Sequence, residues 1–596
     1  MRPSRPCSTE IAGLALVSDC HSAALVDGQG SITWMCLPRF DSRSVFGALL
    51  DPTAGHWRLG AAGLSETTRV YVKDTLVLET TFQTPTGRAI LTDAFLVGQG
   101  ERGHELGLRS PHVLLRRLVV AEGRFTAEGS FCPRGDFGRT PPVWGTDGPA
   151  LTSTLDAVQL TVCGSPPDEI EPAGAHWLRD LTTGQSLTFT MLSGPAGQPV
   201  AHWSEPEALA RLADTTNAWQ SWSGLHPGLG GPWNEQVRLS GRVLQGLTFA
   251  PTGAVVAAPT TSLPRAGAGG PTHDGRYASV RGADNVARAQ LAGACSHEAV
   301  RTIGWLVDSA ANGAADDGLQ EVFGVGGEAD LSEQQRAELD GWEASGPVRL
   351  GDDRWTRRDV ATAGELLSAV ALVHQLPPPA AKIRRRILAA AADTRAASPP
   401  RRDAARDAVM RWVAVDRAAA LGAWLDGPSV LTPSRASRLA DLEGSAVLRR
   451  ALDPLTGAYT GFSGTTFVEA SALLLVLTGL VPAADAAMDR TVELISGVLS
   501  APCGLLYRDE QAAARHEGTS LLCTFWLVEC LAAQGQFDRA AAIFDQATAY
   551  ANDVGLLSEQ TEPRSGQLLG NFPSSASHAG LICAAASLQE ARSTRF

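Results

Sequence analysis

The chain has 596 residues, of which 44% are hydrophobic and 19% are charged, so it is long enough for two or three domains with ordinary cores. Its formal net charge of −13, without a long basic cluster, argues against nucleic acids and anionic membrane surfaces as partners. The longest apolar run, residues 470–481, is shorter than the roughly 20 residues of a membrane helix. The ten cysteines form no CxxC pair and no zinc-type spacing, which is typical of free thiols in a reducing compartment. We therefore expect a cytoplasmic protein with a small-molecule partner and with neither metal nor cofactor.

The first third of the chain shows the alternating hydrophobic pattern of β-strands. Such runs occur around residues 70–78, 113–115, 125–131, 155–162 and 187–191, with Gly, Pro and Asp between them. Several short strands at this spacing predict an antiparallel β-sandwich over residues 1–205. The period becomes helical at about Glu205, and a Gly/Pro-rich stretch follows at residues 224–231. Residues 206–232 are therefore interpreted as a linker that begins as a helix and continues as a Gly/Pro-rich segment.

Beyond Trp233 the candidate elements are helices rich in alanine and leucine. The predicted helices cover residues 364–376, 404–424, 434–452, 466–480, 487–499, 517–533, 537–551 and 578–592. A region of this length made of helix hairpins predicts a large closed helical array over residues 233–596, rather than a small bundle. No clean internal repeat accompanies it, so the periodicity alone does not prove closure.

One carboxylate near the C-terminus lies in a Gly- and Pro-bounded loop between two Ala-rich segments. It is Glu559, at the end of the run Gly-Leu-Leu-Ser-Glu (555–559), which Gly-Asn-Phe-Pro (570–573) and Ser-His-Ala-Gly-Leu (577–581) follow. This region resembles the catalytic-base region of glycoside hydrolase family 15, the glucoamylases and bacterial trehalases. The resemblance implies that Glu559 is the general base.

Other stretches extend the resemblance over nearly the whole chain. Residues 16–26, 30–34 and 37–42 look like the opening signature of the family, and residues 347–351, 409–417 and 523–529 match further segments. Residues 259–264 resemble the loop after the first barrel helix, with Arg265 where the family has an acidic residue. The resemblance implies a multidomain β + α protein, with an N-terminal antiparallel β-sandwich and a C-terminal (α/α)6 barrel whose site lies in loops at one end.

The second catalytic carboxylate of the family has no counterpart at the matching position. An inverting glycosidase needs one carboxylic acid to protonate the leaving oxygen and one carboxylate to deprotonate water. Counted back from the matched segment at 409–417, the acid falls at Ala396, and Arg395 replaces the tryptophan before it. Neither side chain can donate the proton. Asp393 is the remaining candidate acid, if the loop is displaced.

The sugar-binding segment is partly retained at residues 272–282. Asp274, Arg276, Tyr277 and Arg281 match the family, as does Arg349 further along the chain, and these are the candidate substrate-binding residues. The sugar-holding aspartate is replaced by Gly282, and Asp284 can take its place only if the following helix shifts by two residues.

Two groups of residues in the site region can also be explained by a purely structural role. An ion pair that ties down a loop explains Asp274 and Arg276 equally well. His273, His516 and His578 have no nucleophile or metal spacing, so they are interpreted as loop or core imidazoles.

These observations leave two functions open. The first is inverting hydrolysis of an α-glucosidic bond of the trehalose or maltose type, impaired because the general acid is missing. The second is a catalytically inactive carbohydrate-binding or regulatory protein on the same fold. A phosphorylase is disfavoured, since phosphate would replace the base and here the acid is missing. We expect Glu559 to line a concave pocket close to Arg281 and Arg349, with a small carbohydrate as partner; the oligomeric state stays open.

Overall fold

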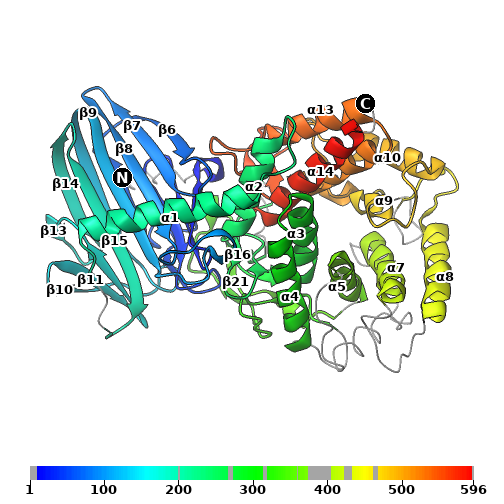
Figure 1. The fold of residues 1–596 in the computed structure, drawn as a ribbon, viewed down its shortest axis with the longest axis horizontal. Coiled ribbons are helices and arrows are strands. Elements are labelled where there is room, and N and C mark those ends of the chain that lie inside the picture. Colours follow the sequence, from blue (N-terminus) through cyan, green and yellow to red (C-terminus); the bar gives the residue numbers. More distant parts are fainter. Residues whose placement is uncertain are drawn as a thin grey trace.

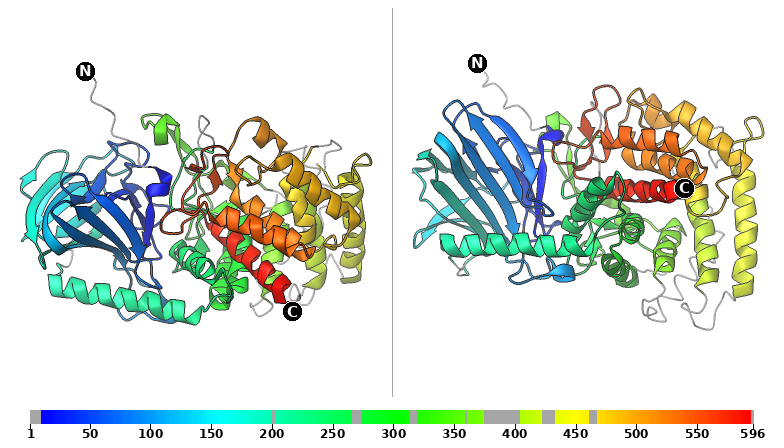
Figure 2. Two further views of the ribbon diagram at one scale, coloured as in Figure 1. Left: turned by 90° about the horizontal axis from the view of Figure 1, so that it is seen from above. Right: turned by 45° about the horizontal axis from the view of Figure 1, so that its top comes forward.

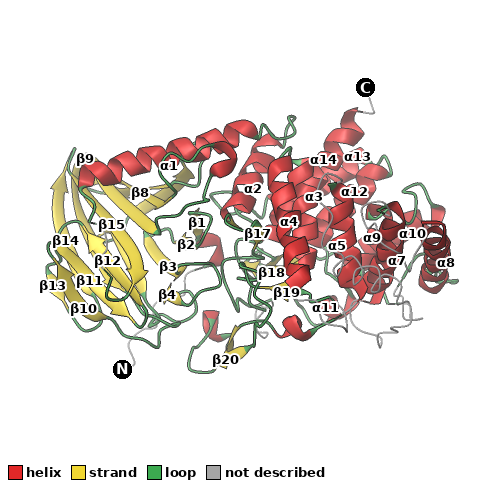
Figure 3. Cartoon of the chain, turned by 60° about the horizontal axis from the view of Figure 1, so that its bottom comes forward, coloured by secondary structure: helices red, strands yellow, loops and turns green. Residues whose placement is uncertain are grey.

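The computed structural model describes residues 10–198, 202–265, 273–312, 319–358, 360–373, 404–421, 433–460 and 467–593. Strands build the first third of the chain and helices the remainder, which confirms the predicted fold class (Figures 1 and 3). Asp393, Arg395 and Ala396 lie outside the described residues. Within the described ranges, no helix is both long and apolar enough to span a bilayer.

The N-terminal domain consists of two antiparallel sheets that share one long strand. Its strands are β1 (Ala15–Ser18), β2 (Ala23–Val26), β3 (Ser31–Cys36), β4 (Ser44–Phe46), β5 (His56–Ala61), β6 (Glu66–Tyr71), β7 (Leu78–Thr84), β8 (Gly87–Leu96), β9 (Val113–Cys132), β10 (Val143–Asp147), β11 (Ala150–Leu155), β12 (Val158–Cys163), β13 (Glu169–Ile170), β14 (Ala175–Thr182) and β15 (Ser186–Pro195). The first half of β9 pairs with β8 and β15, whereas its second half pairs with β5 and β14. The sequence predicted separate short strands here, because Gly123, which adopts φ +73° at the change of sheet, interrupts the apolar pattern.

The helices of the second domain form a closed ring. Helix α1 (Glu205–Leu225) precedes this domain and packs on the sandwich. The long helices of the second domain are α2 (Asn234–Gly246), α3 (Val280–Ala292), α4 (Ser296–Asn312), α5 (Val360–Leu372), α7 (Ala404–Ala420), α8 (Pro433–Ala451), α10 (Ala486–Leu499), α12 (Leu521–Ala533), α13 (Phe537–Thr548) and α14 (Ser575–Ser593), and the short ones are α9 (Leu474–Leu477) and α11 (Glu510–Ala514). Around the ring, α3 contacts α5, α5 contacts α7, α7 contacts α9, α9 contacts α12, α12 contacts α14, and α14 returns to α3. Outside it, α4 packs on α3, α8 on α7 and α2 on α14, as in a barrel of helix hairpins.

Several helices differ from their predicted form. The predicted helix at 466–480 is a 3-10 turn, η5 (Ala470–Leu473), followed by the single turn of α9. The predicted set also lacks α3 and α4. For α3 the reason is physical, since Arg281, Asp284 and Arg288 of this helix line internal cavities and interrupt its apolar stripe.

The opening signature of the chain lies at the junction of the two domains. Trp34 on β3 donates an indole hydrogen bond to the carbonyl of Pro259 (2.6 Å), and Ser18 Oγ donates to the carbonyl of Gly246 (2.6 Å). The helix α1 runs along the sandwich toward the helical domain (Figures 1 and 2). The β-domain therefore fixes the start of the loop at 257–265, which forms part of the candidate site.

Candidate functional site

A polar cavity of about 530 Å³ lies at one end of the helical ring. Its wall includes the N-terminal ends of α3, α12 and α14 and the loops that precede them. Its charged lining residues are Arg265, Arg281, Arg354, Arg357, Arg406, Arg508, Glu321, Asp353, Glu469, Asp509 and Glu559. Because both charge signs occur in similar numbers, the cavity suits a neutral ligand that offers many hydrogen-bond donors and acceptors.

Glu559 lies on the wall of this cavity, at the start of a small antiparallel sheet. This sheet consists of β22 (Thr519–Ser520), β23 (Gln560–Thr561) and β24 (Leu568–Leu569), so it joins the Glu559 loop to the N-terminus of α12. Ser577 Oγ of α14 donates to the carbonyl of Ser558 (2.7 Å), which fixes the residue just before the carboxylate. The Glu559 backbone is thus held by two neighbouring elements, and its side chain keeps 24% exposure toward the cavity.

Gly570 permits the close packing of the Glu559 side chain. It adopts φ +77°, and a Cβ atom built on it would lie 2.7 Å from Glu559 Cβ. Any other L residue would be strained at this φ and would collide with Glu559. The next residue, Asn571, closes the loop, because its Nδ2 donates to the carbonyl of His273 (2.8 Å).

Arg265 connects Glu559 to His273. The Nη2 group of Arg265 lies 2.8 Å from Glu559 Oε1 and 3.0 Å from His273 Nδ1. Burial, together with the nearby charges of Arg354, Arg265 and Arg281, lowers the pKa of His273 well below its usual value. The neutral imidazole therefore accepts the Arg265 hydrogen bond at Nδ1. Sequence reasoning noted Arg265 as a departure from the family pattern but did not predict this ion pair.

Asp274 and Arg276 form a buried ion pair outside the cavity lining. Asp274 is 1% and Arg276 is 2% exposed. Arg276 donates to both Asp274 oxygens (2.9 and 2.6 Å) and to the carbonyl of Ser42 in the β-domain (2.6 Å). Asp274 Oδ2 also accepts from the amide of Gly351 (3.1 Å). These contacts match the alternative of an ion pair that ties down a loop, since the polar groups of both residues bind each other and the junction between the domains.

Tyr277 shares the surroundings of this ion pair. The Arg276 guanidinium lies 5.9 Å from the centroid of the Tyr277 ring and 5.0 Å from that of Phe137. Tyr277 does not line the cavity either. The retained Asp-x-Arg-Tyr pattern therefore supports the loop that carries His273.

Arg281 and Arg349, the two remaining candidates, differ in position. Arg281, in the first turn of α3, lines the cavity, and its Nε lies 3.4 Å from Glu365 Oε1. The side chain of Arg349 pairs with Glu333 (3.6 Å) and is absent from the lining. Its backbone supports the site instead, because its amide donates to Ser262 Oγ (2.7 Å) and its carbonyl accepts from Thr261 Oγ1 (2.6 Å).

A second cavity of about 360 Å³ lies along the inside of the ring and shares Arg281, Asn285, Arg406 and Trp526 with the first. Asp284 lines this inner cavity, where burial raises the pKa of its carboxyl to about 7. Burial also raises the pKa of Glu365, against the opposing charges of Arg406 and Arg281. Near neutral pH, Asp284 is thus a carboxyl that can still carry a proton.

The other two histidines, His516 and His578, lie in a loop and in the core, as the sequence suggested. His578 is fully buried, its Nε2 accepts from the amide of Leu557 (3.1 Å), and its Nδ1 lies 3.0 Å from Ser240 Oγ. Burial lowers the pKa of His578 to about 3, so it is a neutral structural imidazole. His516 lies outside the cavity lining, at an exposed turn with φ +54°.

The fold and site define a two-domain protein with a β-sandwich, a barrel of helix hairpins and a polar site at one end of the barrel. Residues 6–164 match the family model described as trehalase-like, N-terminal, and residues 240–385 match glycosyl hydrolases family 15. The trehalase of Mycolicibacterium smegmatis is 32% identical over 610 residues, covering 96% of this chain and 90% of the relative. The trehalase of Mycobacterium tuberculosis is 31% identical over 608 residues, covering 96% and 88%.

Among solved structures, a bacterial glucoamylase complexed with acarbose superposes with a TM-score of 0.69 at 14% identity, covering 98% of this chain and 94% of that chain. This likeness concerns the fold. The sequence relatives carry the assignment further: the chain belongs to glycoside hydrolase family 15 and is a trehalase-like member. The resemblance seen in the sequence is thereby confirmed, and with it the general class of a glycoside hydrolase.

Proposed function

We propose that this protein hydrolyses the α-glucosidic bond of a small sugar, trehalose first, with inversion at the anomeric carbon and with Glu559 as general base. The observation that carries the proposal is the position of Glu559, on the wall of the polar cavity and held by a hairpin, by α14 and by Arg265. The trehalases of the two mycobacterial relatives support trehalose as the first sugar to test.

In the proposed reaction, Glu559 takes a proton from a water molecule as the water oxygen attacks the anomeric carbon. The glycosidic C–O bond breaks on the opposite face, and its oxygen needs a proton from a carboxylic acid. The ring hydroxyls can donate to the carboxylates and accept from the arginines of the cavity. The mixed charges would thus orient the sugar without a cofactor.

The proposed activity is slow on natural glycosides, because Ala396 stands where the family keeps its general acid. General acid catalysis contributes roughly 10²- to 10⁴-fold. A substrate whose leaving group departs as an anion avoids this requirement. α-Glucosyl fluoride should therefore be hydrolysed faster than trehalose by roughly 10²-fold or more.

The test compares turnover of trehalose, maltose, starch and α-glucosyl fluoride by three proteins: the natural chain, Glu559→Gln and Glu562→Gln. Glu562 lies three residues further along, outside the cavity lining, and accepts hydrogen bonds within its own turn. We expect fluoride hydrolysis that Glu559→Gln abolishes and Glu562→Gln retains. Equal rates for Glu559→Gln and the natural chain would contradict the assignment of the base.

Two other outcomes distinguish the alternatives. Binding of trehalose without turnover of any substrate, with or without phosphate, would favour the non-catalytic carbohydrate-binding protein. Rapid trehalose hydrolysis would show that a carboxyl supplies the missing proton. Asp393→Asn and Asp284→Asn, measured side by side, would then identify it.

A further inference from the structure

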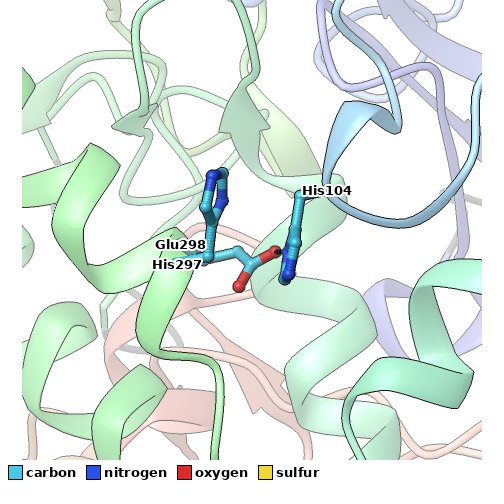
Figure 4. A group of neighbouring side chains, drawn as sticks. All are labelled: His104, His297 and Glu298. Atoms are coloured by element: carbon cyan, nitrogen blue, oxygen red, sulfur yellow. Dashed lines mark hydrogen bonds and ion pairs between the residues drawn. The ribbon is translucent and has the colours of Figure 1, made fainter.

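Three histidines and a glutamate gather at the junction of the two domains, away from the candidate active site. His104 lies in η2 (Gly103–Glu105) of the β-domain, and His297 and Glu298 lie in the first turn of α4 in the helical domain. One ligand atom from each of these three residues lies within 4.8 Å of the other two. Figure 4 shows the Glu298 carboxylate reaching His104 while the His297 ring stands beside them. His226, directly after α1, completes the group.

The glutamate at the centre is held in a fixed orientation. Glu298 is 8% exposed, and its Oε1 accepts from the indole nitrogen of Trp222 (3.0 Å). The same oxygen lies 2.8 Å from His104 Nδ1, and Oε2 lies 3.1 Å from His226 Nε2. The rings of His104 and His297 stack with their centroids 4.2 Å apart. A buried carboxylate therefore faces imidazole nitrogens that come from both domains.

His226 fixes the second oxygen of the Glu298 carboxylate. Its Nδ1 lies 2.8 Å from the carbonyl oxygen of Trp222, while its Nε2 faces Glu298. The imidazole is thus held between a backbone carbonyl and the carboxylate, which fixes the position of Glu298 Oε2.

We propose that His104, His297 and Glu298 bind a divalent metal ion of the zinc class, with His226 holding the second carboxylate oxygen. Imidazole and carboxylate ligands suit Zn²⁺ and similar transition metals, whereas Mg²⁺ and Ca²⁺ prefer oxygen ligands alone. Tetrahedral zinc ligands lie about 3.4 Å from one another. Since the ligand atoms already lie within 4.8 Å, small side-chain rotations close the site. The 39% exposure of the His104 side chain gives the ion a route of entry.

The metal would join the β-domain to the helical domain. His104 belongs to the first and His297 and Glu298 to the second, so the ion binds the folded junction and not the separated parts. A ligand that binds only the folded state raises the midpoint of unfolding by mass action. With zinc at about a hundred times its dissociation constant, we expect Tm to rise by at least about 2 °C.

The experiment uses the full chain, first treated with a chelator and then titrated with Zn²⁺ by calorimetry and with Co²⁺ by visible absorption. The variants are His297→Ala, which removes an exposed ligand, and the matched control His202→Ala, which removes a partly exposed histidine that pairs with Asp147 on the sandwich. We expect the natural chain to bind one equivalent of metal and to show the absorption bands of tetrahedral Co²⁺. The affinity should be at least about tenfold weaker in His297→Ala and unchanged in His202→Ala.

Two results would overturn the proposal. One is the absence of zinc binding and of any Tm shift in the natural chain. The other is equal affinity in the natural chain and in His297→Ala, which would place bound zinc elsewhere. Because this site is separate from the Glu559 cavity, neither result depends on whether the protein hydrolyses sugars.

Discussion

At the scale of single residues, His578 shows how burial sets the charge of a side chain that the sequence alone leaves ambiguous. Its imidazole accepts a hydrogen bond from the amide of Leu557 and lies fully inside the helical domain. Burial lowers its pKa to about 3 in the folded protein, against about 6.5 in the unfolded chain. The folded state therefore cannot take up the proton that the unfolded state binds below pH 6.5.

This difference predicts a loss of stability in acid. Between pH 6.5 and pH 3 the unfolded chain binds more protons at this site, so the free energy of unfolding falls as pH falls. The loss due to His578 reaches roughly 2 kcal/mol at pH 5. His578→Gln keeps an acceptor for the Leu557 amide but removes the titration. The gap in stability between the natural chain and this variant should thus shrink from pH 7 to pH 5 in denaturant unfolding; an unchanged gap would refute the account.

At the scale of elements, the β23–β24 hairpin positions the candidate base through Gly570. Gly570→Ala places a methyl group 2.7 Å from Glu559 Cβ at φ +77°. We expect a loss of roughly 1–3 kcal/mol of stability and a fall in α-glucosyl fluoride turnover, because Glu559 must move. Gly535→Ala is the matched control: φ is +76° there, but the added Cβ meets no atom within 4 Å. It should cost about 1 kcal/mol and leave turnover unchanged. Equal effects on turnover would show that the hairpin does not position the base.

The sequence predicted whether most elements are strands or helices, but it predicted few of the contacts between them. Period-two and period-3.6 patterns revealed the sandwich and most barrel helices, because one face of each is buried in a core. The sequence did not predict helix α3, since Arg281, Asp284 and Arg288 line the inner cavity and interrupt its apolar pattern. The motif around Glu559 placed it in a loop, and the structure places that loop at the cavity. The pairing of Arg265 with Glu559 spans 294 positions, so no local pattern could reveal it.

At the scale of the whole molecule, Asp274 and Arg276 contact the junction between the two domains, although the family resemblance alone predicts that they bind the sugar. Arg276 reaches across to the carbonyl of Ser42, and its charge is balanced by Asp274 inside the structure. The opening signature contributes Ser18 and Trp34 to the same junction. Sequence matching retained these residues, but it could not distinguish contact with a ligand from contact between domains.

If the Asp274–Arg276 ion pair is structural, its loss should lower the stability of the protein and leave its affinity for substrate unchanged. Asp274→Ala leaves the Arg276 guanidinium buried and unpaired, which costs about 3–5 kcal/mol. The Michaelis constant of the remaining folded enzyme for α-glucosyl fluoride should stay the same. Asp168→Ala is the control, because it breaks the Arg179–Asp168 pair on the surface of the sandwich, where Asp168 is 51% exposed. Its effect on stability should be much smaller than that of Asp274→Ala. A large rise in the Michaelis constant with little change in Tm would contradict this structural role and would indicate that Asp274 binds substrate.

The central claim, that Glu559 activates water in an inverting reaction, is tested most directly by the first anomer of glucose released from α-glucosyl fluoride. Water that Glu559 deprotonates attacks the face opposite the leaving group, so proton NMR recorded before mutarotation should show β-glucose, and Glu559→Gln should release none. Release of α-glucose, or β-glucose formed equally fast by Glu559→Gln, would contradict the account.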